Sequence, residues 1–154
     1  MRQTLQSCLF IITLFITSFA SAENLTEESV KNLISRVDNA VNSLNADEIA
    51  ATMSDNIVII MNITMQGQKQ VLKPSKQEYI ALLKQGWAAY QNYKYSKSNM
   101  KITLNNNKAL VTANVKESMT IQGQNISGSS REEVTIELVN NKPMITAITG
   151  YTSM

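Results

Sequence analysis

The feature that most constrains the fold of this chain is a strict alternation of apolar and polar residues over residues 109–121. Apart from an acidic interruption at Glu117, the apolar set occupies every second position: Ala109, Val111, Ala113, Val115, Met119 and Ile121. A period of two predicts a β-strand with one buried and one solvated face. Because a slip of one residue would exchange the two faces, the pattern also predicts a strongly specified register.

Three predicted turns extend the buried face to the neighbouring strands. A two-residue loop at Gly123–Gln124, which the glycine allows, places apolar residues opposite one another: Val111 opposite Ile136 and Ala113 opposite Val134. A turn at Asn106–Asn107, where asparagine tolerates positive φ, continues the face: Leu104, Ile102 and Met100 lie opposite Ala109, Val111 and Ala113. A turn at Asn140–Asn141 completes it: Ile145 lies opposite Ile136, Ala147 opposite Val134, Thr149 opposite Glu132 and Tyr151 opposite Ser130.

Two glutamates, Glu117 and Glu132, fall on this otherwise apolar face. Carboxylates that are diagonal neighbours on a half-buried face push each other's proton affinities apart, so one of them could act as a general acid or base. Ser130 and Tyr151 fall beside them, and the Tyr151 hydroxyl could donate to a developing oxyanion. In the alternative interpretation the apolar face ends near Val115, and both glutamates lie in water at the rim of the sheet.

Residues 1–22 have the pattern of a secretory signal peptide. Arg2 precedes an apolar run over residues 9–19, and small residues follow it as a cleavage site: Ala20, Ser21 and Ala22. The run is shorter than the roughly 20 residues that span a bilayer. We therefore expect an exported protein, periplasmic or secreted, with a single domain over 23–154 and no stable membrane anchor after processing.

The composition excludes several classes of site. The chain has no histidine, and its one cysteine, Cys8, lies in the predicted signal peptide. A Ser-His-Asp triad, a Cys-His pair and the usual zinc sites are therefore excluded, and we predict neither a metal nor another cofactor. The chain has 14 basic and 12 acidic residues without a basic run, so we expect no nucleic-acid partner.

Capping signals predict the helices of the first half of the chain. Thr26 caps an apolar periodicity that runs to Leu44, and Asn45 with Glu48 predicts a short second helix. A hairpin of residues 57–63 and 71–72 follows, with its turn at 66–68. Ser75 and Glu78 form a capping box for a third helix with an apolar side: Tyr79, Ile80, Leu82, Leu83, Trp87 and Tyr90. Gly86 inside it predicts a close approach of helix and sheet.

This order of elements resembles the nuclear-transport-factor-2-like superfamily, which includes SnoaL-like polyketide cyclases and ketosteroid isomerases. The resemblance is carried by the helix from Thr26 to Leu44, the passage 53–57, the capped helix from Ser75 and the strand series ending at Met154. It implies an α+β fold of cystatin-like α-β-β-α-β-β-β-β order, in which a strongly curved, mostly antiparallel sheet forms a cone around the helices. The implied pocket is lined from the sheet by Glu117, Ser130, Glu132 and Tyr151, with Trp87 and Tyr90 on the helical wall and Asp55 at the mouth.

No catalytic pattern of these relatives transfers intact. Ketosteroid isomerases use a tyrosine on an early helix, which is missing here, and scytalone-dehydratase-like members use histidine. We therefore hold three functional hypotheses: binding of a small apolar or amphipathic molecule without catalytic machinery, an isomerase, cyclase or hydratase that uses a pocket glutamate, and a homodimeric assembly module of the cell envelope that pairs through its sheet face.

Overall fold

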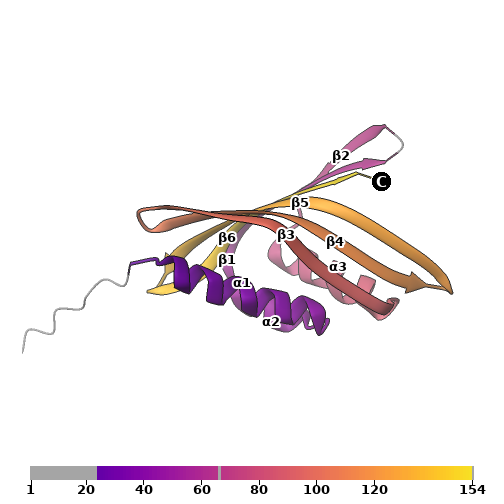
Figure 1. The fold of residues 1–154 in the computed structure, drawn as a ribbon, viewed down its shortest axis with the longest axis horizontal. Helices are drawn as coiled ribbons and strands as arrows, with labels where there is room; N and C mark the ends of the chain where they lie inside the picture. The colour runs from indigo at the N-terminus through magenta and orange to yellow at the C-terminus, as the bar shows by residue number, and fades with distance from the viewer. Residues whose placement is uncertain (1–23, 66, 154) are drawn as a thin grey trace, which may run out of the picture.

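The computed structural model describes residues 24–65 and 67–153, so the predicted signal peptide lies outside the described residues. The described residues form three helices and six strands in the predicted order (Figure 1). In chain order the elements are α1 (Glu27–Asn42), α2 (Ala46–Thr52), β1 (Met53–Met65), β2 (Gln68–Leu72), α3 (Lys76–Ala88), β3 (Gln91–Asn105), β4 (Lys108–Ile121), β5 (Gln124–Val139) and β6 (Lys142–Ser153).

All three predicted helix caps are confirmed. The Thr26 hydroxyl accepts from the Ser29 backbone in a capping box, and the Asn45 side chain accepts from the Glu48 backbone. Ser75 and Glu78 form the reciprocal capping box of α3. These contacts satisfy backbone N–H groups that the first helical turn would otherwise leave unpaired.

The strands form one six-stranded sheet in the order β2-β1-β6-β5-β4-β3. Neighbouring strands are antiparallel except β1 and β6, which are parallel. The sheet is curved and not closed, and the three helices lie on one side of it (Figure 1). The α+β architecture with a mostly antiparallel, curved sheet is therefore confirmed.

The apolar core lies between the helices and the inner face of the sheet. Ile136 and Ala109 on the sheet and Val30 on α1 are fully enclosed, and the burial of β4 confirms the predicted alternation from Ala109 as far as Lys116. Among the described residues, no helix is both long and apolar enough to cross a bilayer.

The turn between β4 and β5 differs by one residue from the prediction. Its two central residues are Gln122 and Gly123, with φ of 50° and 79°, which is typical of a hairpin turn that needs positive φ at both positions. Ala109 therefore pairs with Ile136 and Val111 with Val134, so the predicted partners were wrong. The faces were right, because the error displaces every partner by two residues and a strand repeats its face every two residues.

Two β-bulges overturn other parts of the predicted register. In β3, Ser98 pairs with Asn114 and Lys101 with Thr112, so Asn99 and Met100 together oppose Ala113. Asn99 has φ of 53°, which gives the strand its extra residue. Ile102 and Leu104 keep their predicted partners, but Met100 does not lie on the buried face and is exposed.

The second bulge lies in β6 at Thr146. Ile145 pairs with Ile136 as predicted, but Ala147 pairs with Thr135, so the following partners shift by one. Tyr151 consequently pairs with Arg131 rather than Ser130, and it faces away from the helices. A single inserted residue is enough to move a side chain to the other face.

The first strand begins earlier than predicted, at Met53. Asp55, which precedes the predicted strand of residues 57–63, is therefore part of β1. Its side chain is fully exposed and pairs with the Lys76 ammonium at 3.2 Å.

Candidate functional site

A cavity of about 100 Å³ lies between the helices and the inner face of the sheet. Most of its wall is apolar and comes from α1, α2, α3, β1, β5 and β6: Ile34, Val37, Val41, Ile49, Met53, Leu83, Trp87, Val134, Ile145 and Ile148. Its polar wall consists of six side chains, Tyr79, Tyr93, Tyr95, Lys97, Glu117 and Glu132. Such a set can surround an apolar body and orient one polar group.

Small residues on the adjacent strands leave room beside the two glutamates. Glu132 pairs with Ala113 on β4 and with Gly150 on β6, while Glu117 pairs with Gly128 on β5. A Cβ atom added at Gly128 or Gly150 would meet no atom within 4 Å. The space next to the carboxyl groups is therefore a consequence of the glycines opposite them.

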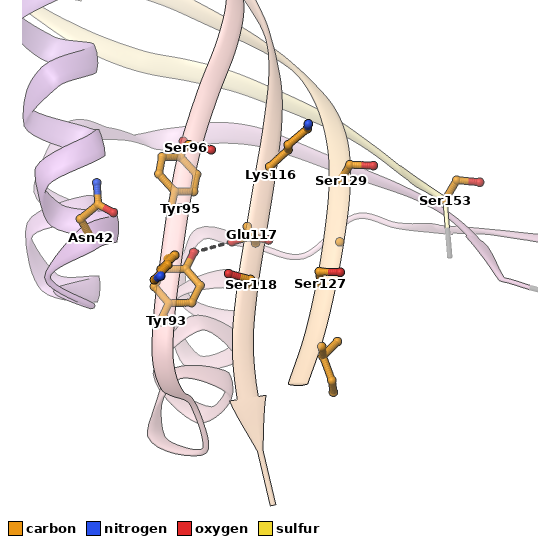
Figure 2. Close-up of a pocket in the computed structure, with 13 residues that line it drawn as sticks. Asn42, Tyr93, Tyr95, Ser96, Lys116, Glu117, Ser118, Ser127, Ser129 and Ser153 are labelled. Carbon is orange, nitrogen blue, oxygen red and sulfur yellow. Dashed lines mark hydrogen bonds between the residues drawn. The ribbon is translucent and has the colours of Figure 1, made fainter. Parts of the chain in front are cut away.

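Glu117 is held by a hydrogen bond from the Tyr93 hydroxyl, which joins β3 to β4 (Figure 2). The Tyr93 ring in turn stacks on Tyr90, with ring centroids 5.7 Å apart, and lies 6.5 Å from the Trp87 ring. Burial and the nearby Glu117 carboxylate raise the pKa of Tyr93, so this hydroxyl keeps its proton and remains a donor.

A partly buried ion pair forms the α1 side of the polar wall. The Lys97 ammonium lies 2.7 Å from the Asp38 carboxylate, and only 11% of the Lys97 side chain is exposed. The Tyr95 hydroxyl donates to the same carboxylate at 3.4 Å, and the Lys97 ammonium lies 5.5 Å from the centre of the Tyr95 ring. Asp38 therefore accepts from two side chains of β3 and ties α1 to that edge of the sheet.

Glu132 is a largely buried carboxyl group of the site. Burial raises its pKa; the Lys97 ammonium opposes that effect, and the Glu117 and Asp38 carboxylates add to it. Burial is also the main cause that raises the pKa of Tyr79, followed by Glu132 and Glu117. Near neutral pH, Tyr79 is a hydrogen-bond donor and Glu132 holds its proton more tightly than an exposed glutamate does.

Every completely enclosed side-chain nitrogen or oxygen among the described residues has a hydrogen-bond partner. The Tyr79 hydroxyl and the Glu132 carboxyl group have no such partner among these residues, so neither group is completely enclosed. Both side chains line the cavity. Their polar atoms are therefore open to the cavity, where only a water molecule or a ligand can satisfy them.

An open cleft of about 1060 Å³ adjoins the cavity (Figure 2). Tyr93, Tyr95 and Glu117 line both spaces, while Asn42 of α1 and Gly128 of β5 line the cleft alone. The shared side chains mark the passage between the surface and the cavity.

No family model and no curated protein matches this sequence. Solved structures match it along most of its length. An NTF2-like protein from Cytophaga hutchinsonii has a TM-score of 0.64 and 12% identity, covering 83% of this chain and 99% of its own. An NTF2-like protein of unknown function from Pseudomonas putida has a TM-score of 0.65 and 17% identity, covering 81% and 84%. A Novosphingobium aromaticivorans protein provisionally named a scytalone dehydratase has a TM-score of 0.63 and 12% identity, covering 82% and 83%.

This chain has the NTF2-like fold. Three of the predicted pocket residues line the cavity of this NTF2-like domain: Glu117, Glu132 and Trp87. The alternative that both glutamates lie in water at the rim of the sheet is wrong for Glu132, which faces the cavity. Tyr90 lies behind Tyr93 rather than in the cavity wall, and its ring stacks on the Tyr93 ring.

The other three predicted residues lie elsewhere in the NTF2-like domain. Ser130 pairs with Val115 on the inner face but lines neither the cavity nor the cleft. Tyr151 is on the outer face, where the Arg131 guanidinium lies 5.8 Å from its ring centre. Asp55 is exposed beside Lys76 and does not reach the cavity.

Five polar residues of the site were not predicted as such: Asp38, Tyr79, Tyr93, Tyr95 and Lys97. Tyr93, Tyr95 and Lys97 stand at every second position, which indicated one common face of a strand. Asp38 had no comparable signal, because its partner Lys97 is 59 residues away.

Proposed function

We propose that this NTF2-like domain binds a small organic molecule that is apolar over most of its surface and carries one hydrogen-bonding group. The observation that supports the proposal is the pair of open polar groups, Tyr79 and Glu132, in a cavity whose wall is mostly apolar. Tyr79 supplies a donor, and the Glu132 carboxyl group supplies an acceptor, and a donor when protonated.

The size of the cavity limits how such a molecule is held. A cavity of about 150 Å³ holds benzene, so the roughly 100 Å³ available here accommodates part of a ring-sized molecule. The rest of the molecule passes Tyr93 and Tyr95 into the open cleft. The rings of these two tyrosines then pack against its apolar surface.

Trp87 provides a direct test of binding, because it is the only tryptophan of the chain and lines the cavity. We expect cyclohexanol to shift the tryptophan emission and the indole N–H resonance in a saturable manner. Substitution Gly150→Val fills the space beside Glu132 and should abolish this response. Thr149→Val, at the adjacent position on the outer face, is the matched control and should leave it intact. A response that survives Gly150→Val would contradict binding in the cavity.

The raised pKa of Glu132 favours a second candidate function, proton transfer to or from the bound molecule. A carboxyl group whose pKa is moved toward neutral pH exchanges protons efficiently at physiological pH. For a ketone, the Glu132 carboxylate would remove a proton from the carbon next to the carbonyl group. The Tyr79 hydroxyl would donate a hydrogen bond to the enolate oxygen, and the proton would return to carbon from Glu132.

Deuterium exchange tests proton transfer without knowledge of the natural substrate. In D₂O, the protein should accelerate the exchange of the protons next to the carbonyl group of cyclohexanone, as followed by proton NMR. Glu132→Gln should remove the acceleration, and Glu133→Gln, on the outer face of the same strand, should retain it. Equal exchange rates with Glu132→Gln and wild type would eliminate Glu132 as the base while leaving the binding proposal unaffected.

A further inference from the structure

The polar wall of the cavity contains more carboxyl groups than cations. Of the charged groups that shift the pKa of Glu132, two are carboxylates, Asp38 and Glu117, and one is a cation, Lys97. Lys97 is engaged by Asp38 at 2.7 Å, and neither glutamate forms an ion pair among the described residues. Arg131 belongs to an outer-facing position of β5, and Lys94 and Lys116 line the open cleft rather than the cavity.

The remaining polar wall is made of aromatic rings. Tyr93, Tyr95 and Trp87 line the cavity, and Tyr79 completes the set from α3. The face of an aromatic ring attracts cations, and the Lys97 ammonium already lies over the Tyr95 ring at 5.5 Å from its centre. The wall thus combines two glutamates that form no ion pair among the described residues with rings that favour positive charge.

We infer that the molecule held in this cavity carries a positive charge and is a small organic amine, whose ammonium group lies between Glu117 and Glu132. The inference rests on the proposed binding function and specifies the class of ligand. A buried carboxylate without a cation is costly, and a proton or a ligand cation can remove that cost. The ammonium group also satisfies the open carboxyl group of Glu132 with a charge-assisted hydrogen bond.

The same arrangement disfavours anions. A carboxylate ligand would meet Glu117 and Glu132 directly, and Lys97, already paired with Asp38, would offer little compensation. Like charges placed together in a site of low dielectric repel strongly. The cavity should therefore discriminate among molecules of equal size by their charge alone.

Three probes of one shape test the inference at pH 7: cyclohexylammonium, cyclohexanol and cyclohexanecarboxylate, with charges of +1, 0 and −1. Binding is followed through Trp87 emission and its indole resonance. We expect the ammonium probe to bind about tenfold more tightly than the alcohol, which corresponds to one charge-assisted hydrogen bond, and the carboxylate to bind most weakly.

Glu132→Gln should bring the affinities of the ammonium probe and the alcohol within about threefold, because it removes the charge but keeps the shape. Glu133→Gln is the matched control on the outer face and should preserve the tenfold preference. If the alcohol binds wild type as tightly as the ammonium probe, the amine inference is wrong and the binding function stands. If no probe binds, the binding function itself is contradicted, and the inference with it.

The preference for the ammonium probe over cyclohexanol should also depend on pH in a defined direction. The charged or titratable groups around Glu132 are Asp38, Lys97, Glu117, Tyr79, Tyr93 and Tyr95. The ammonium probe favours the ionised form of Glu132, so its affinity should increase as pH rises through the raised pKa of that carboxyl group. Cyclohexanol should show no such increase. Equal pH profiles for the two probes would contradict the inference.

Discussion

Glu132 and Glu133 are consecutive residues of β5 with identical side chains, and the sheet directs them to opposite faces. Glu133 lies on the outer face and accepts from the Arg131 guanidinium at 2.5 Å. Glu132 lies on the inner face, without an ion-pair partner among the described residues, and burial raises its pKa. The face to which a residue belongs therefore decides whether a glutamate is part of the solvated surface or of the candidate site.

The inner face itself has two parts that differ in packing. Toward one end, Ile136 and Ala109 pair across β5 and β4 and are completely enclosed. Toward the other, Glu132 and Glu117 stand opposite glycines and border the cavity. One alternating pattern thus builds a close-packed core and, where the neighbouring residues become glycine, an open site.

The largest loss of stability is expected in the close-packed part of the inner face. Ile136→Ala removes a fully enclosed side chain, and we expect the free energy of unfolding in urea to fall by about 3 kcal/mol. Thr135→Ala, at the adjacent outer-facing position, should cost about 1 kcal/mol or less. Similar losses at both positions would contradict the division between a packed inner and a solvated outer face.

The next effect concerns the ion pair of the site. Lys97→Met leaves the Asp38 carboxylate without its cation, and because 31% of the Asp38 side chain is exposed we expect a loss of about 2 kcal/mol in unfolding free energy. Lys94→Met, on the outer face of the same strand, should change the value by less than about 0.5 kcal/mol. The double variant Asp38→Asn/Lys97→Met should recover part of the loss, because it no longer buries an unpaired charge. If the double variant recovered none of the lost unfolding free energy, the result would argue against a stabilising ion pair between Asp38 and Lys97.

The sequence predicted which residues of β4 and β5 face the core. An alternating pattern keeps its faces when the pairing of two strands is wrong by an even number of residues. The predicted β4–β5 loop was displaced by one residue, yet Val111 and Val134 remained on the inner face. The caps at Thr26, Asn45 and Ser75 were also predictable, because each depends on a contact between residues three apart.

Bulges and distant pairs were not predictable in this way. The extra residue of the β6 bulge is Thr146, and a threonine does not distinguish a bulge from a regular strand in the sequence. The bulge nevertheless moves Tyr151 to the outer face. The pairing of Asp38 with Lys97 depends on how α1 crosses the sheet, which no local pattern records. A glycine inside a strand generally weakens it, whereas in this fold Gly128 and Gly150 leave the space beside the glutamates.

A smaller effect is expected when the two glutamates are exchanged for glutamine. Folding raises the pKa of Glu132, so the native state binds this proton more tightly than the unfolded chain does. The resulting stability is full below the unfolded pKa of about 4.3 and is lost as pH rises through the folded pKa. Relative to wild type, Glu132→Gln should therefore gain unfolding free energy as pH rises from 4 to 8. Glu133→Gln should show no such gain, and equal pH profiles of the two variants would contradict the comparison.

The smallest effect is expected at Tyr151, which tests the register at the end of β6. On the outer face Tyr151 is 44% exposed, and the Arg131 guanidinium lies 5.8 Å from its ring centre. Tyr151→Ala should therefore lower the unfolding free energy by about 0.5–1 kcal/mol, the value of an exposed cation–π contact. The affinity of cyclohexanol, measured through Trp87, should not change. Without the bulge at Thr146, Tyr151 would point toward Ser130 and the site, and its removal would alter that affinity, so the binding measurement distinguishes the two registers more sharply than stability does.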